Sequence, residues 1–505
     1  MPSTFLGRVD DALQNDPLRT TFTGSTSVLN RLRNDGYAQT ADFAELQAAA
    51  RAMREDALGH LPALLQQLEA QVTANGGDVV WAVDAAEASR IVVALAQARR
   101  AKTIVRSRSA VAEEIGLDAA LEAAGLRVVD TELGDAILQL SGDSASHPVY
   151  PALHWRKEQV AALFTEQLDM PETVDIQSLA GMARFTLRSQ LLQADMSIGG
   201  VDLAVAETGT LALAGDSGSD RFGLAVARVH VAVMGIEQVV ASVEDLFFLL
   251  QLRARSASGA ALAGSVTLLD GPARPGDPDG PDELVLIIVD NGRSDLLRWG
   301  YGEALACIKC GACVNACPVY REIGGQAYGG QPAGPIGAVV LPLLPMPAPR
   351  IPPGGQKSAR FGIPTRRLPA TAPASPSVLS TVLRDTPFAD LAQASTLCGA
   401  CGDVCPVGID IPRLLIRLRG DFHQAGRSTP GQQMGRRLFA WSMASAEHYG
   451  RLHRWLVRSA RPFGKERIHR LPPPLRSWTQ NRDLPPPAQR MFRERWQAQR
   501  SEDRP

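Results

Sequence analysis

The residues whose types and spacing most directly predict chemistry are seven cysteines, none of which lies before position 307. Their positions are 307, 310, 313, 317, 398, 401 and 405. Scattered core cysteines would not cluster in this way. An odd, closely spaced set in a chain without a secretory signal argues against a disulfide framework. The cysteines therefore indicate a metal site or an iron–sulfur centre.

The first run of cysteines has the spacing of bacterial ferredoxins. It extends from Cys307 to Pro318 as C-I-K-C-G-A-C-V-N-A-C-P, which is the pattern C-x2-C-x2-C-x3-C-P. Three thiolates at these intervals can surround a cubane only if the backbone between them curls into a loop. The amides of such a loop can point at the cluster sulfurs and offset their negative charge.

The second run repeats the end of the first. It extends from Cys398 to Pro406 as C-G-A-C-G-D-V-C-P. When the two runs are aligned on their C-P steps, Ser395 stands where the first run has its first cysteine. Two cubanes need eight protein ligands, and this chain supplies seven thiolates. Ser395 is the obvious oxygen ligand for the remaining position, although a serine there could equally cap a helix.

In two-cluster ferredoxins the fourth cysteine of each run binds the cluster of the other run. This rule assigns one cluster to Cys307, Cys310, Cys313 and Cys405. The other cluster receives Cys317, Cys398 and Cys401. We therefore predict two [4Fe–4S] clusters, the second with a non-cysteine ligand or else present as a [3Fe–4S] cluster. Structural zinc would be satisfied by four thiolates, but it does not explain the ferredoxin string, and no histidine lies near either run.

The composition predicts a globular protein. Hydrophobic residues make up 45% of the 505 residues and charged residues 21%, which argues against global disorder. The apolar runs are too short to span a bilayer. The N-terminus has no apolar signal region, so the expected compartment is the cytoplasm.

Positive charge is concentrated at the C-terminal end. Residues 421–505 contain 17 Lys/Arg and 7 Asp/Glu, a net charge of +10, which leaves −11 on the rest of the chain. Such a tail suggests contact with a partner protein, a nucleic acid or an anionic membrane surface, or else a solvated extension. No nucleic-acid module is recognisable, so nucleic acid is not an expected partner. Arginines interleave with Trp441, Trp455, Trp478 and Trp496, residue types that dominate interfaces.

Strand and helix patterns alternate between residues 78 and 130, which predicts a mainly parallel sheet covered on both faces. The predicted strands are 78–83, 102–106 and 126–130, with helices at 85–99 and 110–124. Helices follow over 155–195, then strands at 201–206, 210–214 and 230–234, and a helix at 243–254. The apolar run 283–289 predicts a strand in the centre of the sheet.

These patterns predict four regions. Residues 1–64 form an N-terminal helical segment and residues 65–299 an α/β domain. Residues 300–425 form the two-cluster domain, and residues 426–505 a basic, helical and Pro-rich tail. The two-cluster domain is interrupted at 345–376, where nine prolines in 32 residues predict an extended insertion.

Three further residues are weak candidates for catalysis. Glu207 sits in the turn E-T-G-T and could act as a base, or it could be an ion-paired residue of a tight turn. His230 lies in an apolar strand, where a satisfied core histidine is the more frequent situation. Arg293 follows a buried strand, and strand ends are where α/β proteins bind ligands. An arginine there suits a carboxylate substrate or a structural salt bridge.

With the ferredoxin string in place, several other segments become recognisable. They are residues 77–82, 199–210, 229–237, 276–281, 289–294, 303–313 and 334–338. On these segments the chain closely resembles the LutB family of lactate-utilisation iron–sulfur proteins, over most of residues 10–345 and 388–420. The insertion is longer than we expect for that family, and the tail beyond 430 is less clearly matched.

The resemblance implies an α/β LUD domain similar to the NagB/RpiA/CoA-transferase group, followed by an α-helical ferredoxin-like domain. It implies an electron-transfer component of a complex that oxidises L-lactate to pyruvate, rather than a complete enzyme alone. The implied partners are a cysteine-rich iron–sulfur protein and a second LUD protein. The alternatives are the iron–sulfur subunit of another oxidoreductase, such as a glycolate oxidase or a heterodisulfide-reductase-like enzyme, and a cluster-bearing sensor. A bound flavin stays open, because nucleotide fingerprints are absent but do not decide it.

Overall fold

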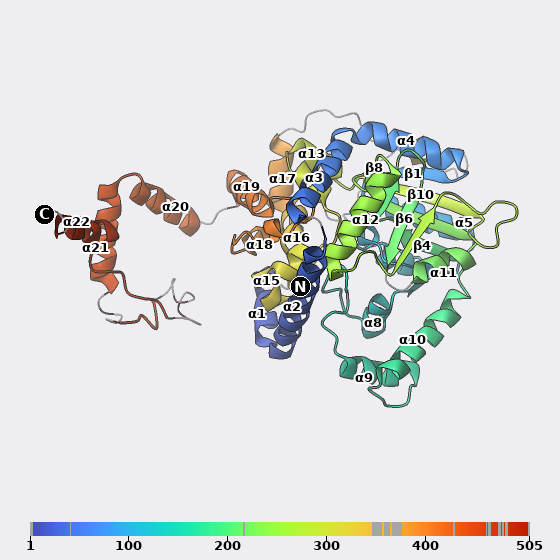
Figure 1. Ribbon diagram of the computed structural model, residues 1–505, viewed down its shortest axis with the longest axis horizontal. Helices are drawn as coiled ribbons and strands as arrows, with labels where there is room; N and C mark the ends of the chain where they lie inside the picture. The colour runs from blue at the N-terminus through green and yellow to red at the C-terminus, as the bar shows by residue number, and fades with distance from the viewer. Residues whose placement is uncertain are drawn as a thin grey trace. The chain divides into compact units, whose positions relative to one another are not determined.

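The structure is a computed structural model. It describes residues 4–40, 42–215, 218–345, 356–357, 364–365, 376–427, 430–460, 462, 466–472, 476, 479 and 483–502. The chain divides into two compact units, residues 1–425 and 426–505, which are described separately (Figure 1).

The first unit is built around a parallel sheet. In the described part of the chain its strand order is β1 (Asp78–Ala82), β10 (Glu283–Val289), β7 (Val229–Gly235), β4 (Met196–Gly200), β2 (Thr103–Arg106), β3 (Arg127–Asp130). Every neighbouring pair is parallel. β10 lies between β1 and β7 and is buried along nearly its whole length, which explains its continuous run of β-branched and leucine residues. The predicted mainly parallel sheet and central strand are confirmed.

The two faces of this sheet pack against different layers. Alternate strand residues, such as Val285 and Ile287, face helices α5 (Ala85–Ala98), α6 (Ala110–Glu114) and α7 (Leu117–Ala123). The residues between them, such as Leu286, face helix α4 (Leu61–Ala74) and a second, smaller sheet. That sheet has the order β8 (Val239–Val240), β5 (Leu203–Val205), β6 (Leu211–Gly215), β9 (Ser265–Leu269). Helices alone therefore do not cover both faces.

Two differences between the sequence predictions and the structure lie at glycine residues. The helix predicted over 110–124 breaks at Gly116, which adopts a φ of 66° and separates α6 from α7. Strand β4 was not predicted, because its Gly199-Gly200 pair has low strand propensity. A side chain at Gly200 would lie 2.6 Å from the backbone oxygen of Arg108, so close packing against the loop after β2 requires glycine there.

The remaining helices of the α/β domain lie at its periphery. Two predicted helices in the region 155–195 are present as α9 (Lys157–Leu168) and α10 (Ile176–Leu191), which pack with α8 (Leu133–Ser141) around a small core of their own. Helix α11 (Ser219–Val226) packs on β2, β4 and β6. Helix α12 (Val243–Ser258) follows β8 and contacts the N-terminal helix α2.

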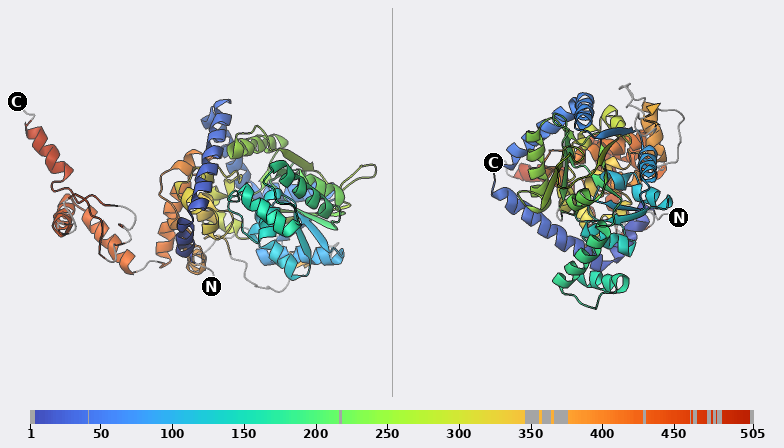
Figure 2. Two further views of the ribbon diagram at one scale, coloured as in Figure 1. Left: turned by 90° about the horizontal axis from the view of Figure 1, so that it is seen from below. Right: turned by 90° about the vertical axis from the view of Figure 1, so that its right-hand side faces the viewer.

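The cysteines lie within or between short helices that share a common core. These elements are α13 (Arg293–Arg298), η1 (Gly302–Ala306), α14 (Ala312–Ala316), α15 (Pro318–Ile323), η2 (Gln326–Tyr328), α16 (Gly334–Val340), α17 (Pro376–Asp385), η3 (Ala389–Gln393), α18 (Ala400–Asp403) and α19 (Ile411–Gln424). The core also takes in residues of α1 (Phe5–Gln14), α2 (Asp16–Ala38) and α3 (Phe43–Gly59). The N-terminal helices therefore belong spatially with the cysteine-bearing helices, as Figures 1 and 2 show.

One buried arginine joins three parts of this unit. The guanidinium of Arg54, on α3, donates hydrogen bonds to the carbonyl oxygens of Glu237 (2.6 Å), Val239 (3.1 Å), Leu305 (3.1 Å) and Ala306 (3.3 Å). Only 1% of Arg54 is exposed, and this burial lowers its pKa. The contacts hold the end of the α/β domain against the turn that leads into the first cysteine.

Most of the Pro-rich insertion 345–376 lies outside the described residues. Within it, β11 (Gln356–Lys357) pairs antiparallel with β12 (Pro364–Thr365). In the second unit, α20 (Pro430–Met443) and α21 (Ala446–Ala460) match the helical part predicted for the tail, and α22 (Phe492–Glu502) was not predicted. Among the described residues, no helix combines the length and apolarity needed to cross a bilayer.

Replacing Arg54 with methionine should destabilise the first unit by roughly 3 to 5 kcal/mol, because four buried carbonyls lose their donor. Chemical denaturation monitored by circular dichroism measures this change. The control is Arg51→Met on the same helix, where the side chain is about half exposed and pairs with Glu55. That change should cost less than about 1 kcal/mol. Equal effects of the two substitutions would contradict the proposed bridging role of Arg54.

Candidate iron–sulfur centre

The first cysteine run forms a tight loop that begins after η1. Lys309 and Gly311, which flank Cys310, adopt positive φ values of 57° and 76°, and Gly311 is the N-cap of α14. This conformation turns backbone amides towards sulfur. The N–H of Lys309 donates to Sγ of Cys307 over 3.4 Å. The predicted curled loop with inward-pointing amides is therefore present.

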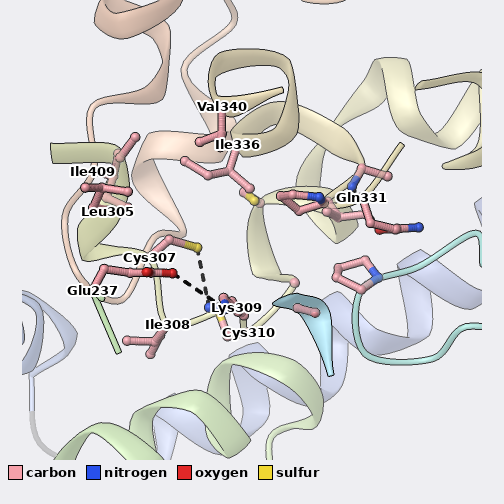
Figure 3. A pocket seen from close by; sticks show the side chains of 18 of the residues that line it. Glu237, Leu305, Cys307, Ile308, Lys309, Cys310, Gln331, Ile336, Val340 and Ile409 are labelled. Atoms are coloured by element: carbon pink, nitrogen blue, oxygen red, sulfur yellow. Dashed lines mark hydrogen bonds and ion pairs between the residues drawn. The ribbon is translucent and has the colours of Figure 1, made fainter. Parts of the chain in front are cut away.

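Four thiols line one internal cavity of about 100 Å³. They belong to Cys307, Cys310, Cys313 and Cys405. Cys405 lies between α18 and α19, and its Sγ accepts a hydrogen bond of 3.4 Å from the N–H of Ile409. Ile336, Val340 and Ile409 give the cavity an apolar wall (Figure 3).

The other three cysteines lie beside one another at the edge of this region. Cys317 and Cys401 are buried, whereas Cys398 is exposed. Burial raises the pKa of Cys401 to about 12, and the neighbouring thiols of Cys317 and Cys398 add to the shift. The N–H of Tyr320 donates to Sγ of Cys317 over 3.5 Å. Helices α14 and α18, which carry Cys313 and Cys401, pack against each other, so the two sets are adjacent.

The donor atoms and their surroundings fit iron–sulfur clusters. Burial raises the pKa of Cys310 to about 12 and that of Cys405 to about 11, so stable thiolates there need the positive charge of iron. The amide contacts to sulfur are of the kind that tunes such clusters. In the described part of the chain, no three metal-binding side chains converge closely enough to hold one ion. The first four thiols instead surround a space.

The cavity has a charged end formed by the α/β domain. Arg293 lies between two carboxylates, 2.8 Å from Glu114 and 2.6 Å from Glu237. Burial opposes its charge, but the attraction of these carboxylates outweighs that effect and raises the pKa of Arg293. Lys309 Nζ lies 3.7 Å from the other oxygen of Glu237 (Figure 3). Arg293 therefore lines the cavity and forms salt bridges there. Of the two roles predicted for it, carboxylate binding and a structural salt bridge, the structure has the salt bridge.

The other two catalytic candidates lie elsewhere. His230 is fully buried in β7, where its Nδ1 lies 2.8 Å from Ser197 Oγ, and burial lowers its pKa to about 3. It is therefore a neutral core histidine at ordinary pH. Glu207 is exposed in the β5–β6 turn, and its Oε1 accepts a hydrogen bond of 2.9 Å from the N–H of Val243, the first residue of α12. Neither residue lines the cysteine cavity.

Sequence reasoning missed the residues that connect the domains. Glu237 follows the end of β7 just as Arg293 follows β10, so the strand-end rule that selected Arg293 would also have selected Glu237. Lys309 lies between two cysteines of the first run, and no pattern in the sequence marks it as a partner of Glu237. No sequence signal marks Arg54, because its partners are backbone carbonyls far along the chain.

A second cavity of about 460 Å³ lies beside the ends of β2 and β3 and shares Arg108 and Pro148 with the first. Its lining includes Arg253 and the carboxylates of Asp135 and Asp220. The volume is within the range of small-molecule sites.

Two family models match separate parts of the chain. Residues 65–289 match the LUD domain, and residues 303–409 match the 4Fe-4S dicluster domain. The fold and the cysteine sets thus define a LUD-domain protein with a helical domain for two iron–sulfur clusters. Lactate utilization protein B from Bacillus subtilis is 35% identical over 98% of this chain and 96% of its own length. The chain belongs to the lactate utilization protein B family.

Two further relatives carry the same name. The protein from Anoxybacillus flavithermus is 36% identical and covers 99% of this chain and 98% of its own length. The protein from Bacillus licheniformis is 34% identical, with coverage of 99% and 97%. The likeness therefore extends into the C-terminal unit. A solved structure of a DUF162 family protein from Deinococcus radiodurans is 20% identical to this chain. The match covers 45% of this chain and 98% of the other, with a TM-score of 0.25.

Replacing Cys405 with serine should damage the centre that contains Cys307, Cys310 and Cys313, and remove roughly half of the iron. The matched change is Cys401→Ser, which should damage the other centre. Iron analysis and electron paramagnetic resonance of anaerobically purified protein measure both. Each variant should lose the paramagnetic signal of one centre and keep the signal of the other. If Cys405→Ser and Cys401→Ser lose the same signal, the crossed assignment of cysteines is wrong.

Proposed function

We propose that this protein is an iron–sulfur electron-transfer component of a complex that oxidises L-lactate to pyruvate. The family and the 4Fe-4S dicluster domain support a role in lactate utilisation. The electron-transfer role is supported by the arrangement of the two cysteine sets, which lie one after the other between the α/β domain and the surface. One set is enclosed beside the α/β domain, and the other reaches the surface at Cys398.

The enclosed set suits the inner end of an electron path. Its cavity has apolar walls and borders the salt-bridged residues at the strand ends. Exclusion of water limits side reactions of reduced centres. The packing of α14, which carries Cys313, against α18, which carries Cys401, supports transfer between neighbouring centres, and the exposure of Cys398 supports exchange with another protein.

The stoichiometry of the reaction favours a component over a complete enzyme. Oxidation of L-lactate to pyruvate releases two electrons and two protons, and each cubane takes one electron at a time. Two centres in one chain could therefore hold the pair briefly. We propose that the chemistry on lactate and the onward transfer involve two other lactate-utilisation proteins, a cysteine-rich iron–sulfur protein and a second LUD protein.

Anaerobic mixing of the three purified proteins tests this proposal. L-lactate should bleach the visible cluster absorption of this chain when both partners are present, and a dye acceptor should be reduced. The Cys401→Ser variant should slow dye reduction at least about tenfold, because it interrupts the path. Lactate-dependent dye reduction at an equal rate without this chain would contradict the proposal.

A further inference from the structure

The two cysteine loops have the same backbone conformation. In the first, Lys309 before Cys310 has a φ of 57° and Gly311 after it has a φ of 76°. In the second, the residues that flank Cys398 are Leu397, with a φ of 55°, and Gly399, with a φ of 91°. A short helix begins directly after each glycine, α14 in one loop and α18 in the other. The second loop therefore repeats the first in space.

The similarity between the loops extends to Ser395, which stands in the second loop where the first has Cys307. In the first loop, the N–H of Lys309 donates to Cys307 Sγ over 3.4 Å. In the second loop, the N–H of Leu397 donates to Ser395 Oγ over 3.1 Å. The serine hydroxyl thus accepts the hydrogen bond that corresponds to the one accepted by a thiol expected to bind iron. Ser395 Oγ therefore takes the position in the second loop that Cys307 Sγ has in the first.

We propose that Ser395 Oγ is the fourth protein ligand of the second iron–sulfur centre, beside Cys317, Cys398 and Cys401. The inference rests on the proposed presence of that centre. On binding iron, the hydroxyl group loses its proton to solvent and coordinates as an alkoxide, because a bound metal cation lowers the pKa of its ligands. Iron–sulfur centres with non-cysteine ligands on one iron occur elsewhere.

The surroundings hold the serine backbone while leaving its side chain accessible. Arg419, on α19, donates to the carbonyl oxygens of Ala392 (2.7 Å) and Ser395 (3.2 Å), so the lead-in to the loop is fixed. Ser395 is partly exposed and Cys398 is exposed. The oxygen-ligated corner therefore faces solvent. Its iron should be the one that oxidants remove first.

Three variants test the assignment in the full chain, and the readouts need no lactate or partner protein. Ser395→Cys should give a second centre that keeps its iron under mild oxidant better than the native protein. Ser395→Ala should lose about one iron per chain and show the paramagnetic signal of an oxidised three-iron cluster. Thr396→Ala is the control, since this neighbouring residue is exposed. It should behave like the native protein.

If Ser395 only stabilises the turn and does not bind iron, a different result is expected. Cysteine at position 395 can accept the same amide hydrogen bond, so a structural serine would leave the spectra of Ser395→Cys unchanged. Native-like iron content, oxidant sensitivity and Mössbauer spectrum in both position-395 variants would overturn the proposal. If Ser395→Ala loses the second centre entirely, while Ser395→Cys keeps it with an altered spectrum, the proposal is supported.

A separate observation concerns the second unit. Residues 426–505 contain 17 Lys/Arg and 6 Asp/Glu, a net charge of +11. Helix α21 separates its residues by type. Tyr449, Leu452 and Leu456 recur at the spacing of one helix face, and the arginines at 451, 454 and 458 recur with the same spacing on the opposite side. Large apolar side chains of this unit are exposed, including Phe439 at 63% and Trp455 at 62%.

We propose that this unit binds the surface of an anionic phospholipid bilayer, with α21 lying in the plane of the interface. A basic helix with an opposite apolar face and exposed aromatic residues is typical of interfacial binding. Charge complementarity favours anionic lipid, because arginines near such a surface are attracted to its negative charge.

Sedimentation of the full chain with vesicles tests this proposal. Vesicles with one third phosphatidylglycerol should bind the chain at low salt, and pure phosphatidylcholine vesicles should bind at least tenfold more weakly. Changing the three α21 arginines to glutamine should abolish the difference, whereas Arg228→Gln, at an exposed site of the first unit, should not. Equal binding to both kinds of vesicle, or binding only to a partner protein, would overturn the proposal.

Discussion

The structure of the first unit depends on the contact between a fully buried guanidinium and four backbone carbonyls. Arg54 joins helix α3 to the end of the α/β domain at Glu237 and Val239, and to the turn at Leu305 and Ala306 that leads into the first cysteine. A buried cation without partners would be strongly unfavourable, and so would four unpaired carbonyls. Each satisfies the other, so the three segments have one stable relative arrangement.

Once that arrangement exists, a charged network forms where the domains meet. The side chain of Glu237 receives Arg293 from the α/β domain and Lys309 from the cysteine loop. Arg293 also pairs with Glu114, so the buried charges largely balance. The attraction between oppositely charged groups is strong where water is excluded, and it offsets the cost of burying them. The cavity lined by four cysteines is therefore bounded on one side by fixed charges of the LUD domain and on the other by apolar side chains.

The two cysteine loops have the same local conformation but different surroundings. The set that contains Cys405 is enclosed near the LUD domain, and the set that contains Cys398 reaches solvent. The difference follows from packing, since the first loop lies against the strand ends and the second lies beyond it. The chain combines membership of the lactate utilization protein B family with a 4Fe-4S dicluster domain.

The sequence by itself determined the cysteine loops and strand β10, which has a neighbouring strand on each side. These features depend on local spacing and on runs of residues with one propensity, which act within a few residues. Strand β4 was not predictable, because Gly199 and Gly200 have low strand propensity and are required only by the packing of their neighbours. Only the tertiary structure decided that Arg54, Glu237 and Lys309 converge, since their partners are far apart along the chain. Non-local contacts of this kind follow from the packing of whole elements, and no spacing pattern records them.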